Sequence, residues 1–377
     1  MKNKFLVFLE LILILFSFTG CYDASSIENY IYGTGLGIDI NEDNTLNLSL
    51  QILSIEGSNN FTSKLLKPEI INVTCNTINS GLNTINNYIS KPLNLSHCEV
   101  IIFSEAAARK GIGDEINTLA NNLDIRPNSN IIISKNPPQE ILKLVTSHSE
   151  GYSTRFYKSI IDSWKETGFS TNSYFSNFFA SMNSEIPFNY ASYAEIINNT
   201  VQIQGLSVFN RDKLVGVLNS IETLPFLLFT NKLEKSTISI DDPFNPEKKI
   251  DIDISLYKDT KNKVSLSSEH IPYISSDISL NGSITSGSLD FDYSNKENIA
   301  KIENSVNNYI SELCVSSFNK LSKEYNSDIS KFYQYLSYKY LTKQDLEKVN
   351  WVNVFKDSVF TVNCSCEILS SYLFLKQ

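Results

Sequence analysis

Six cysteines are the residues of this chain best suited to covalent chemistry. The first of them, Cys21, follows a short basic start, an apolar stretch over residues 5–18 and the small residues Thr19 and Gly20. This order is typical of a secretory signal peptide, and a cysteine directly after it indicates a bacterial lipobox. We therefore predict a signal peptide over residues 1–20, cleavage between Gly20 and Cys21, and an S-diacylglyceryl group on Cys21, with or without an N-linked palmitate-type acyl chain.

The leader is too short to act as a spanning helix. A transmembrane helix needs roughly 20 apolar residues, and the stretch over 5–18 is shorter and contains Glu10. Two acyl chains are enough for stable anchoring, because each buried methylene contributes about 0.8 kcal/mol. The mature protein should then be lipid-anchored on the extracytoplasmic face of a membrane without crossing it. An uncleaved N-terminal anchor is the alternative.

The five remaining cysteines, an odd number, cannot all pair within one chain, which favours free buried thiols. In Cys364-Ser365-Cys366, strand alternation would point both thiols to one face, and we expect that face to lie in the core rather than to bind a metal. The three histidines, His97, His148 and His270, have no second ligand at metal-binding spacing. We predict no metal site.

Enzyme and nucleotide motifs are absent from the sequence. Gly33-Thr34-Gly35-Leu36-Gly37 lacks the third glycine of a dinucleotide fingerprint and leads into a turn and a strand, so we expect a bulge or tight edge there. No hydrolase elbow, zinc-protease helix or Walker loop occurs, so we predict no catalytic residues, no cofactor and no enzymatic activity. A net charge of −9 with scattered basic residues argues against nucleic acid as a partner.

The first half of the mature chain, residues 21–199, alternates strand and helix patterns. Its apolar periodicity predicts a hairpin over 30–53, a helix over 69–90, a strand–helix–strand unit over 99–133 with parallel strands, and a helix from Pro138. The aromatic-rich stretch 149–199 could form a groove for a small apolar ligand or pack between domains, and we favour packing. Asn198-Asn199-Thr200 is expected to end this domain.

The second half, residues 200–377, is richer in strand patterns. We predict a hairpin over 201–218, a short apolar helix over 221–229, four strand-like runs between 237 and 293, helices over 296–324 and 329–340, and a last strand over 357–369. The chain should therefore adopt a mixed α+β fold of more than one domain, in which the second domain packs an antiparallel sheet on long helices.

Several segments, taken in order, resemble the Ger(x)C family, the lipoprotein C subunits of nutrient germinant receptors in spore-forming bacteria. Cys21-Tyr22-Asp23 resembles the Cys-Trp-Asp that opens the mature proteins, with Tyr22 in place of Trp. Further similarity is found in Gly35-Leu36-Gly37-Ile38-Asp39, in Phe103-Ser104-Glu105 through Ala108-Arg109-Lys110-Gly111, in Arg126, in Gly205 through Val208-Phe209 with Asp212-Lys213-Leu214-Val215-Gly216, and in Trp351 and Phe355.

The resemblance implies a non-catalytic lipoprotein at the inner spore membrane, required for germination through assembly with the integral-membrane A and B subunits. It leaves open whether the subunit contacts a small-molecule germinant. A solute-binding lipoprotein of a transporter is the alternative, and it would share the signal and the lipid. Such a protein should show two similar doubly wound lobes joined by a hinge, which the strand-rich second half disfavours.

Overall fold

The computed structural model describes residues 29–55, 66–122, 124–144, 153–287, 295–340, 344, 346 and 348–371. The predicted signal peptide, the cleavage position Gly20 and the lipid site Cys21 lie outside these residues, as does His148. Within the described ranges, no helix is both long enough and apolar enough to cross a membrane.

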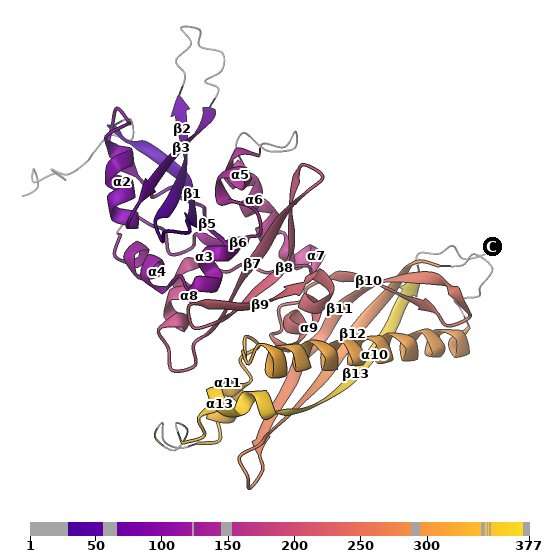
Figure 1. The fold of residues 1–377 in the computed structure, drawn as a ribbon. Helices are drawn as coiled ribbons and strands as arrows, with labels where there is room; N and C mark the ends of the chain where they lie inside the picture. The colour runs from indigo at the N-terminus through magenta and orange to yellow at the C-terminus, as the bar shows by residue number, and fades with distance from the viewer. Residues whose placement is uncertain are drawn as a thin grey trace, which may run out of the picture.

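Two β-sheets organise the described part of the chain (Figure 1). The first sheet has nine strands there, in the order β3-β2-β1-β5-β6-β7-β8-β9, with β4 paired to β1. Its strands are β1 (Ile31–Ile40), β2 (Leu46–Ile55), β3 (Leu66–Cys75), β4 (Leu93–Asn94), β5 (Val100–Ser104), β6 (Asn130–Ser134), β7 (Phe188–Ile197), β8 (Thr200–Asn210) and β9 (Lys213–Asn219).

The predicted hairpin over 30–53 and the predicted strand–helix–strand unit are confirmed. β1 and β2 pair antiparallel, with a register shift between Gly33 and Gly35, so the glycine run forms a bulge as expected. β1, β5, β6 and β7 then pair parallel, which places the predicted crossover in the middle of the sheet. The crossover helix is interrupted, because Gly111 adopts a φ of +119° between its two parts.

The helix predicted over 69–90 is wrong in its first part. Residues up to Cys75 form β3, which pairs antiparallel with β2 over its whole length, and the helix α2 begins only at Ile78. Ile71 and Val73 alternate toward the core as in a strand, yet their spacing to Ile78 and Leu82 also fits a helix. Hydrogen bonds to β2 pair the backbone N–H and C=O groups of this segment, and they favour the strand over the helix.

Helices cover both faces of the first sheet. Leu36, Ile38 and Phe103 point into a core closed by one group of helices, and Val100 and Ile102 point into a second core closed by the other group. The first group is α2 (Ile78–Asn86), α3 (Glu105–Lys110), α4 (Gly113–Ala120) and α8 (Phe175–Met182); the second is α5 (Pro138–Lys143) and α6 (Ser153–Asp162), followed by the short α7 (Trp164–Thr167). Phe175 and Phe178 of the aromatic-rich stretch pack within this first core, whereas Phe188 of the same stretch lies in the core that includes the second sheet.

The expected division at residue 199 falls on the turn between β7 and β8. Asn198 and Asn199 have φ values of 51° and 59°, and the two strands pair antiparallel on either side of them. This pair of positive φ values is the backbone of a tight hairpin turn, for which asparagine is well suited. β8 and β9 therefore extend the first sheet, and the domain limits 21–199 and 200–377 stay a prediction.

The second sheet has the order β10-β11-β12-β13 in the described chain. Its strands are β10 (Ser236–Asp242), β11 (Asn245–Leu266), β12 (Pro272–Ser286) and β13 (Val359–Ser371). β10, β11 and β12 pair antiparallel as expected, whereas β13 joins β12 in parallel, because the chain returns to it through the helices after residue 295. Two of the four predicted strand-like runs, those around residues 250–257 and 264–268, fall on the single long strand β11, which ends at Leu266.

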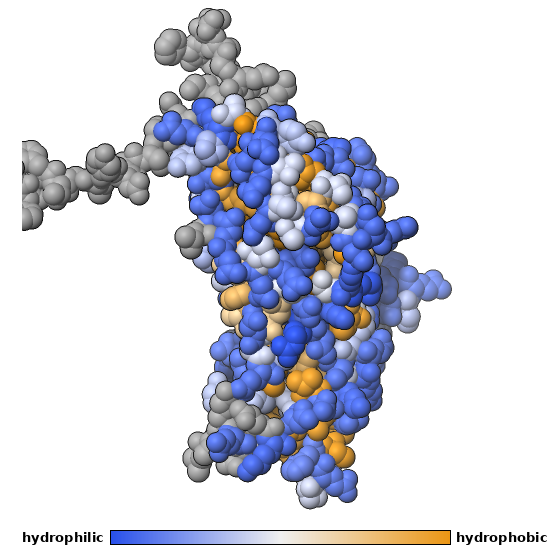
Figure 2. Space-filling model, turned by 60° about the vertical axis from the view of Figure 1, so that its left-hand side comes forward, coloured by the Kyte–Doolittle hydropathy of each residue, from blue (hydrophilic) through white to orange (hydrophobic). Residues whose placement is uncertain are grey.

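A long helix covers one face of the second sheet (Figure 1). This helix, α10 (Lys296–Asn319), buries Ile302, Val306, Ile310, Cys314 and Phe318, one residue every four positions, and continues into a π-helical turn at Lys320–Glu324. The helix predicted over 329–340 is shorter, as α11 (Tyr333–Ser337), and is followed by α13 (Trp351–Val354). The surface in Figure 2 is mainly hydrophilic, with its hydrophobic residues scattered.

The helix α9 (Ser220–Phe229) connects the two sheets through a common core. Leu206, Val208 and Leu218 of the first sheet belong to the same buried cluster as α9, the second sheet and α10. The two halves differ in strand number, strand order and helix cover, so the described residues do not form the two similar lobes expected of a solute-binding lipoprotein.

Candidate functional site

Two segments that carried the sequence resemblance meet at one end of the first sheet. The turn between β8 and β9 places Asp212 against the break between α3 and α4, where the Ile112 N–H donates to the Asp212 carbonyl at 3.1 Å. The φ of +119° at Gly111 is one that residues with a side chain rarely adopt, and a Cβ atom there would also lie 2.6 Å from Asp212 Oδ2, so glycine suits this position. This hydrogen bond connects two segments that lie about 100 positions apart in the sequence.

The helix α3 is held in place by its own charged residues. Ser104 caps it by accepting from the Ala107 N–H at 3.1 Å, and Glu105 pairs with Arg109 at 2.5 Å. The Tyr193 hydroxyl on β7 donates to Glu105 at 2.6 Å. Burial alone would raise the pKa of Glu105, but the hydrogen bonds from Tyr193 and Arg109 outweigh burial and the pKa is lowered. The Glu105 carboxylate is therefore charged, and it holds α3 against the sheet.

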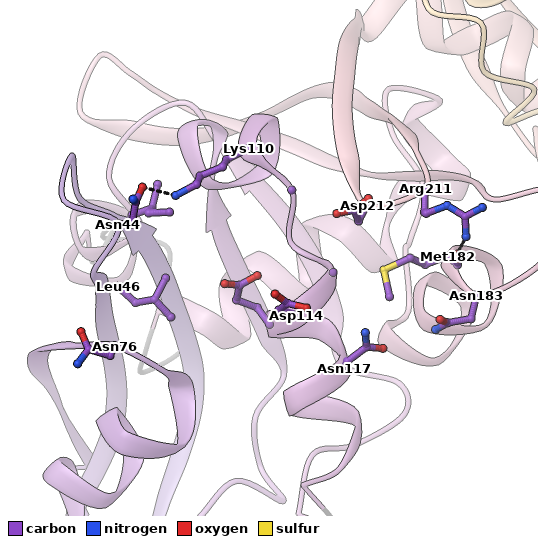
Figure 3. Close-up of a pocket in the computed structure, with 14 residues that line it drawn as sticks. Asn44, Leu46, Asn76, Lys110, Asp114, Asn117, Met182, Asn183, Arg211 and Asp212 are labelled. Carbon is purple, nitrogen blue, oxygen red and sulfur yellow. Dashed lines mark hydrogen bonds between the residues drawn. The ribbon is translucent and has the colours of Figure 1, made fainter.

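A polar groove of about 500 Å³ opens where these segments meet (Figure 3). Loops and helix ends from the whole of this end of the sheet line it: Ile40, Asn44, Leu46, Asn76, Lys110, Gly111, Gly113, Asp114, Glu115, Asn117, Met182, Asn183, Arg211 and Asp212. Lys110 bonds Asn44, and Arg211 donates to the Met182 carbonyl at 3.3 Å. The rim of the groove therefore carries both positive and negative side chains.

Three carboxylates concentrate negative charge on one side of the groove. Burial raises the pKa of Glu115, and the neighbouring charges of Asp114 and Asp212 act in the same direction. Among the described residues, no group of three His, Cys, Asp or Glu side chains has the geometry to hold a metal ion. The arrangement suits charge-assisted hydrogen bonds with a polar or cationic partner segment.

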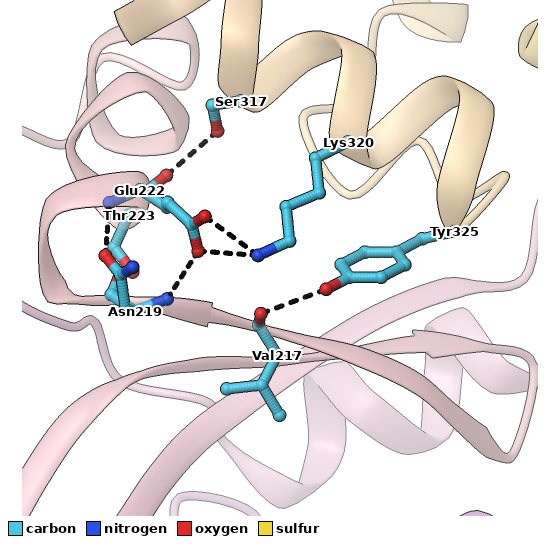
Figure 4. A network of polar contacts seen from close by, with 7 residues as sticks. All are labelled: Val217, Asn219, Glu222, Thr223, Ser317, Lys320 and Tyr325. Carbon is cyan, nitrogen blue, oxygen red and sulfur yellow. Dashed lines mark hydrogen bonds and ion pairs between the residues drawn. The ribbon is translucent and has the colours of Figure 1, made fainter.

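A second polar network fixes the first sheet to the helix of the second (Figure 4). Asn219 caps α9 in a capping box with Glu222, and the Glu222 carboxylate accepts from Lys320 at 2.8 Å. Burial alone would lower the pKa of Lys320, but the hydrogen bond to Glu222, the charge of Glu222 and the contact with Tyr325 together outweigh it, so the pKa is raised. The Tyr325 hydroxyl donates to the Val217 carbonyl at 3.1 Å. These contacts connect the first sheet, which carries the groove, to α10 and the turn that follows it, which cover the second sheet.

The remaining residues singled out from sequence lie apart from this groove. Cys364 and Cys366 share one face of β13 and are 8% and 5% exposed in the main core, as predicted. Cys314 on α10 lies in the same core, and all three are free thiols whose pKa burial raises, for Cys364 and Cys366 to about 12. His97 stacks edge-on against Tyr32, and His270 lies in the β11–β12 turn.

In the sequence, Lys110 and Asp212 stood out only as parts of motifs, and Arg211 lay within the predicted hairpin over 201–218. Their common location was not predicted, because it depends on how β8 and β9 add to the sheet. Nothing in the sequence marked Asp114 and Glu115 as site residues, since they only form part of the predicted helix.

Comparison with known proteins gives the family. A model described as "Spore germination protein N-terminal domain" matches residues 23–193, and one described as "Spore germination B3/ GerAC like, C-terminal" matches residues 204–372. YfkR of Bacillus subtilis (strain 168), which is provisionally named a spore germination protein, is 20% identical over 363 residues, covering 92% of this chain and 91% of YfkR.

Two further proteins agree with this assignment. The spore germination protein GerQC of Bacillus cereus is 22% identical over 214 residues, covering 57% of this chain and 59% of GerQC. The crystal structure of the GerBC protein has a TM-score of 0.59 at 15% identity, covering 89% of this chain and 97% of GerBC, so the fold is shared. The resemblance found in the sequence is confirmed, and the chain belongs to the GerAC-like family of spore germination proteins.

Proposed function

We propose that this chain is the non-catalytic C subunit of a spore nutrient germinant receptor and acts by assembling with the integral-membrane A and B subunits. The observation that carries the proposal is the match of both halves of the family, in order, over residues 23–193 and 204–372. The polar groove supports it, since two segments of family resemblance build an open, charged surface that suits contact with another protein.

The proposal places the protein on the extracytoplasmic face of the inner spore membrane, held by a lipid on Cys21. The first strand begins at Ile31, ten residues after the lipid site. A chain of this length reaches at most about 35 Å when fully extended. The folded part would therefore stay within about one domain diameter of the membrane surface, where integral-membrane partners can reach it.

Deletion of the gene in the spore-forming host tests the role in germination. We expect spores without the chain to lose the response to at least one nutrient, measured as the fall in optical density after nutrient addition, while spore yield is unchanged. Complementation with the wild-type chain should restore the response. A deletion strain that responds to every nutrient at the parental rate would refute the proposal.

A further inference from the structure

The turn between α2 and β4 lies directly beside the start of β1. The Ile31 N–H donates to the Pro92 carbonyl at 3.0 Å, and β4 then pairs with the first two residues of β1. The turn itself is closed by the Leu93 N–H, which donates to Asn86 Oδ1 at 2.9 Å. Residues 86–94 and the start of β1 therefore form one continuous surface at this end of the first sheet.

Tyrosine side chains gather on this surface. Among the described residues up to position 144, Tyr88 is the most exposed large apolar side chain, at 71%. The half-buried rings of Tyr30 and Tyr32 have their centres 6.4 Å apart, and the centre of the Tyr32 ring lies 4.6 Å from that of His97. Tyrosine suits the boundary between water and an apolar phase, because its ring is apolar and its hydroxyl is polar.

The charged residues of the neighbouring loops favour contact with a negatively charged surface. Lys91 lies in the turn before β4, and Arg126 lies in the loop that the Ser129 hydroxyl connects to β5 by donating to the Cys98 carbonyl at 2.6 Å. Both basic residues are exposed. Among the exposed residues that the structure describes in these loops, only Asp124 is acidic, although the whole chain has a net charge of −9. Anionic lipids attract basic side chains of this kind.

The same surface is the part of the described chain that follows the predicted lipid site most closely. The described residues begin at Asn29, eight positions after Cys21. Eight residues span at most about 29 Å when fully extended. A lipid on Cys21 therefore holds the start of β1 near the bilayer, whereas Ile40, at the far end of β1, is about 30 Å further along the strand.

We propose that this tyrosine surface lies against the membrane, with its rings at the level of the lipid headgroups and its two basic residues toward anionic lipids. The residues that make it up are Tyr30, Tyr32, Tyr88, Lys91 and Arg126. The proposal rests on the lipid anchor of the proposed function and adds an orientation to it. The polar groove, which Ile40 and Leu46 line, is at the other end of β1. It then lies up to about 30 Å from the bilayer, within reach of those parts of a partner that project from the membrane.

Fluorescence quenching on the full mature chain tests this orientation. The chain, purified from membranes, is reconstituted into vesicles of phosphatidylcholine and phosphatidylglycerol that include lipids with a nitroxide on the headgroup. A fluorophore is attached at Asn87→Cys, beside Tyr88, or at Lys339→Cys, which follows α11 on the far side of the molecule from α2 (Figure 1). Both positions are exposed, and the chain without an added cysteine gives the background from the native thiols. We expect quenching at position 87 to be about twofold or more stronger than at position 339, because an interfacial surface lies within about 10 Å of the headgroups.

Two matched substitutions assign the quenching to the tyrosine surface. Tyr88→Asp removes an interfacial ring and adds a charge that anionic lipids repel, so it should lower quenching at position 87 to the level seen at position 339. Tyr338→Asp, at a side chain that is 82% exposed, is the matched control and should leave quenching at position 87 unchanged. Because both tyrosines are exposed, the melting temperature of each variant should stay at the wild-type value.

Flotation of the same vesicles separates two kinds of failure. A chain that floats with the vesicles but is quenched equally at positions 87 and 339, or is still quenched at position 87 in the Tyr88→Asp variant, would overturn the orientation and leave the lipid anchor in place. A chain that does not float would refute the lipid anchor, and with it the orientation that depends on the anchor.

Discussion

Replacing Gly216 with alanine should loosen the contact between β9 and the turn that follows α10. The ring of Tyr325 lies directly over Gly216, so that a Cβ atom there would be 2.1 Å from the ring Cζ and 2.2 and 2.5 Å from its two Cε atoms. Contacts this short do not occur, so the ring must move. Moving it breaks the hydrogen bond from the Tyr325 hydroxyl to the Val217 carbonyl.

The cost can be worked from these contacts. Overpacking costs about 1–3 kcal/mol, and the lost hydrogen bond about 1 kcal/mol net. The change from glycine to alanine also stabilises the fold by about 0.5–1 kcal/mol, because glycine in a strand interior loses more conformational entropy on folding. Gly216→Ala should therefore lower the free energy of unfolding by about 2 kcal/mol.

Urea unfolding followed by tryptophan fluorescence measures this change, since Trp351 is buried in the core shared by the two sheets. In a Tyr325→Ala background the clash is gone, and Gly216→Ala should cost less than about 0.5 kcal/mol. Tyr338→Ala, at a side chain that is 82% exposed, controls for the loss of a tyrosine and should be nearly neutral. Equal costs in the two backgrounds would refute the reasoning.

Three further outcomes follow from the same structure and sequence. Cys21→Ala should move the protein from the membrane pellet to the soluble fraction without changing its melting temperature, and an unchanged pellet would contradict the lipid anchor. Burial raises the pKa of Asp328 to about 7, so the folded chain binds the extra proton and this group's contribution to stability falls as pH rises from about 4 to 7. Between pH 5 and pH 8 the unfolding free energy of the wild type, measured in urea, should fall by about 3 kcal/mol relative to Asp328→Asn; equal slopes would exclude the shift. Cys364 and Cys366 should resist alkylation at pH 8 until urea unfolds the chain, as read by peptide mass spectrometry; rapid labelling of either native thiol would contradict their burial.

Local patterns predicted those parts of the fold in which the chain pairs with its own neighbours. Leu46, Leu48 and Leu50 alternate at period two, and their hairpin with β1 forms as expected. The core face of Cys364 and Cys366 followed from the same alternation. In each case the apolar period and the tertiary burial agree.

Pairing between distant segments was not predictable from periodicity. Ile71 and Val73 fit either a strand or a helix, and only the partner strand β2 decides between them. The parallel pairing of β13 with β12 depends on the route of the chain over α10, which no local pattern records.

The candidate sites show the same limit. Sequence resemblance marked the segments around Gly111 and Asp212, but their contact is a property of the completed sheet.

Co-purification from spore membranes tests the central claim of subunit assembly most directly. An affinity-tagged wild-type chain, solubilised in mild detergent, should retain the A and B subunits, identified by mass spectrometry. Asp114→Lys reverses a charge on the groove rim and should reduce their recovery, whereas Asp259→Lys, at an exposed position on β11, should leave it unchanged. Recovery of the wild-type chain alone from intact spore membranes would contradict the account.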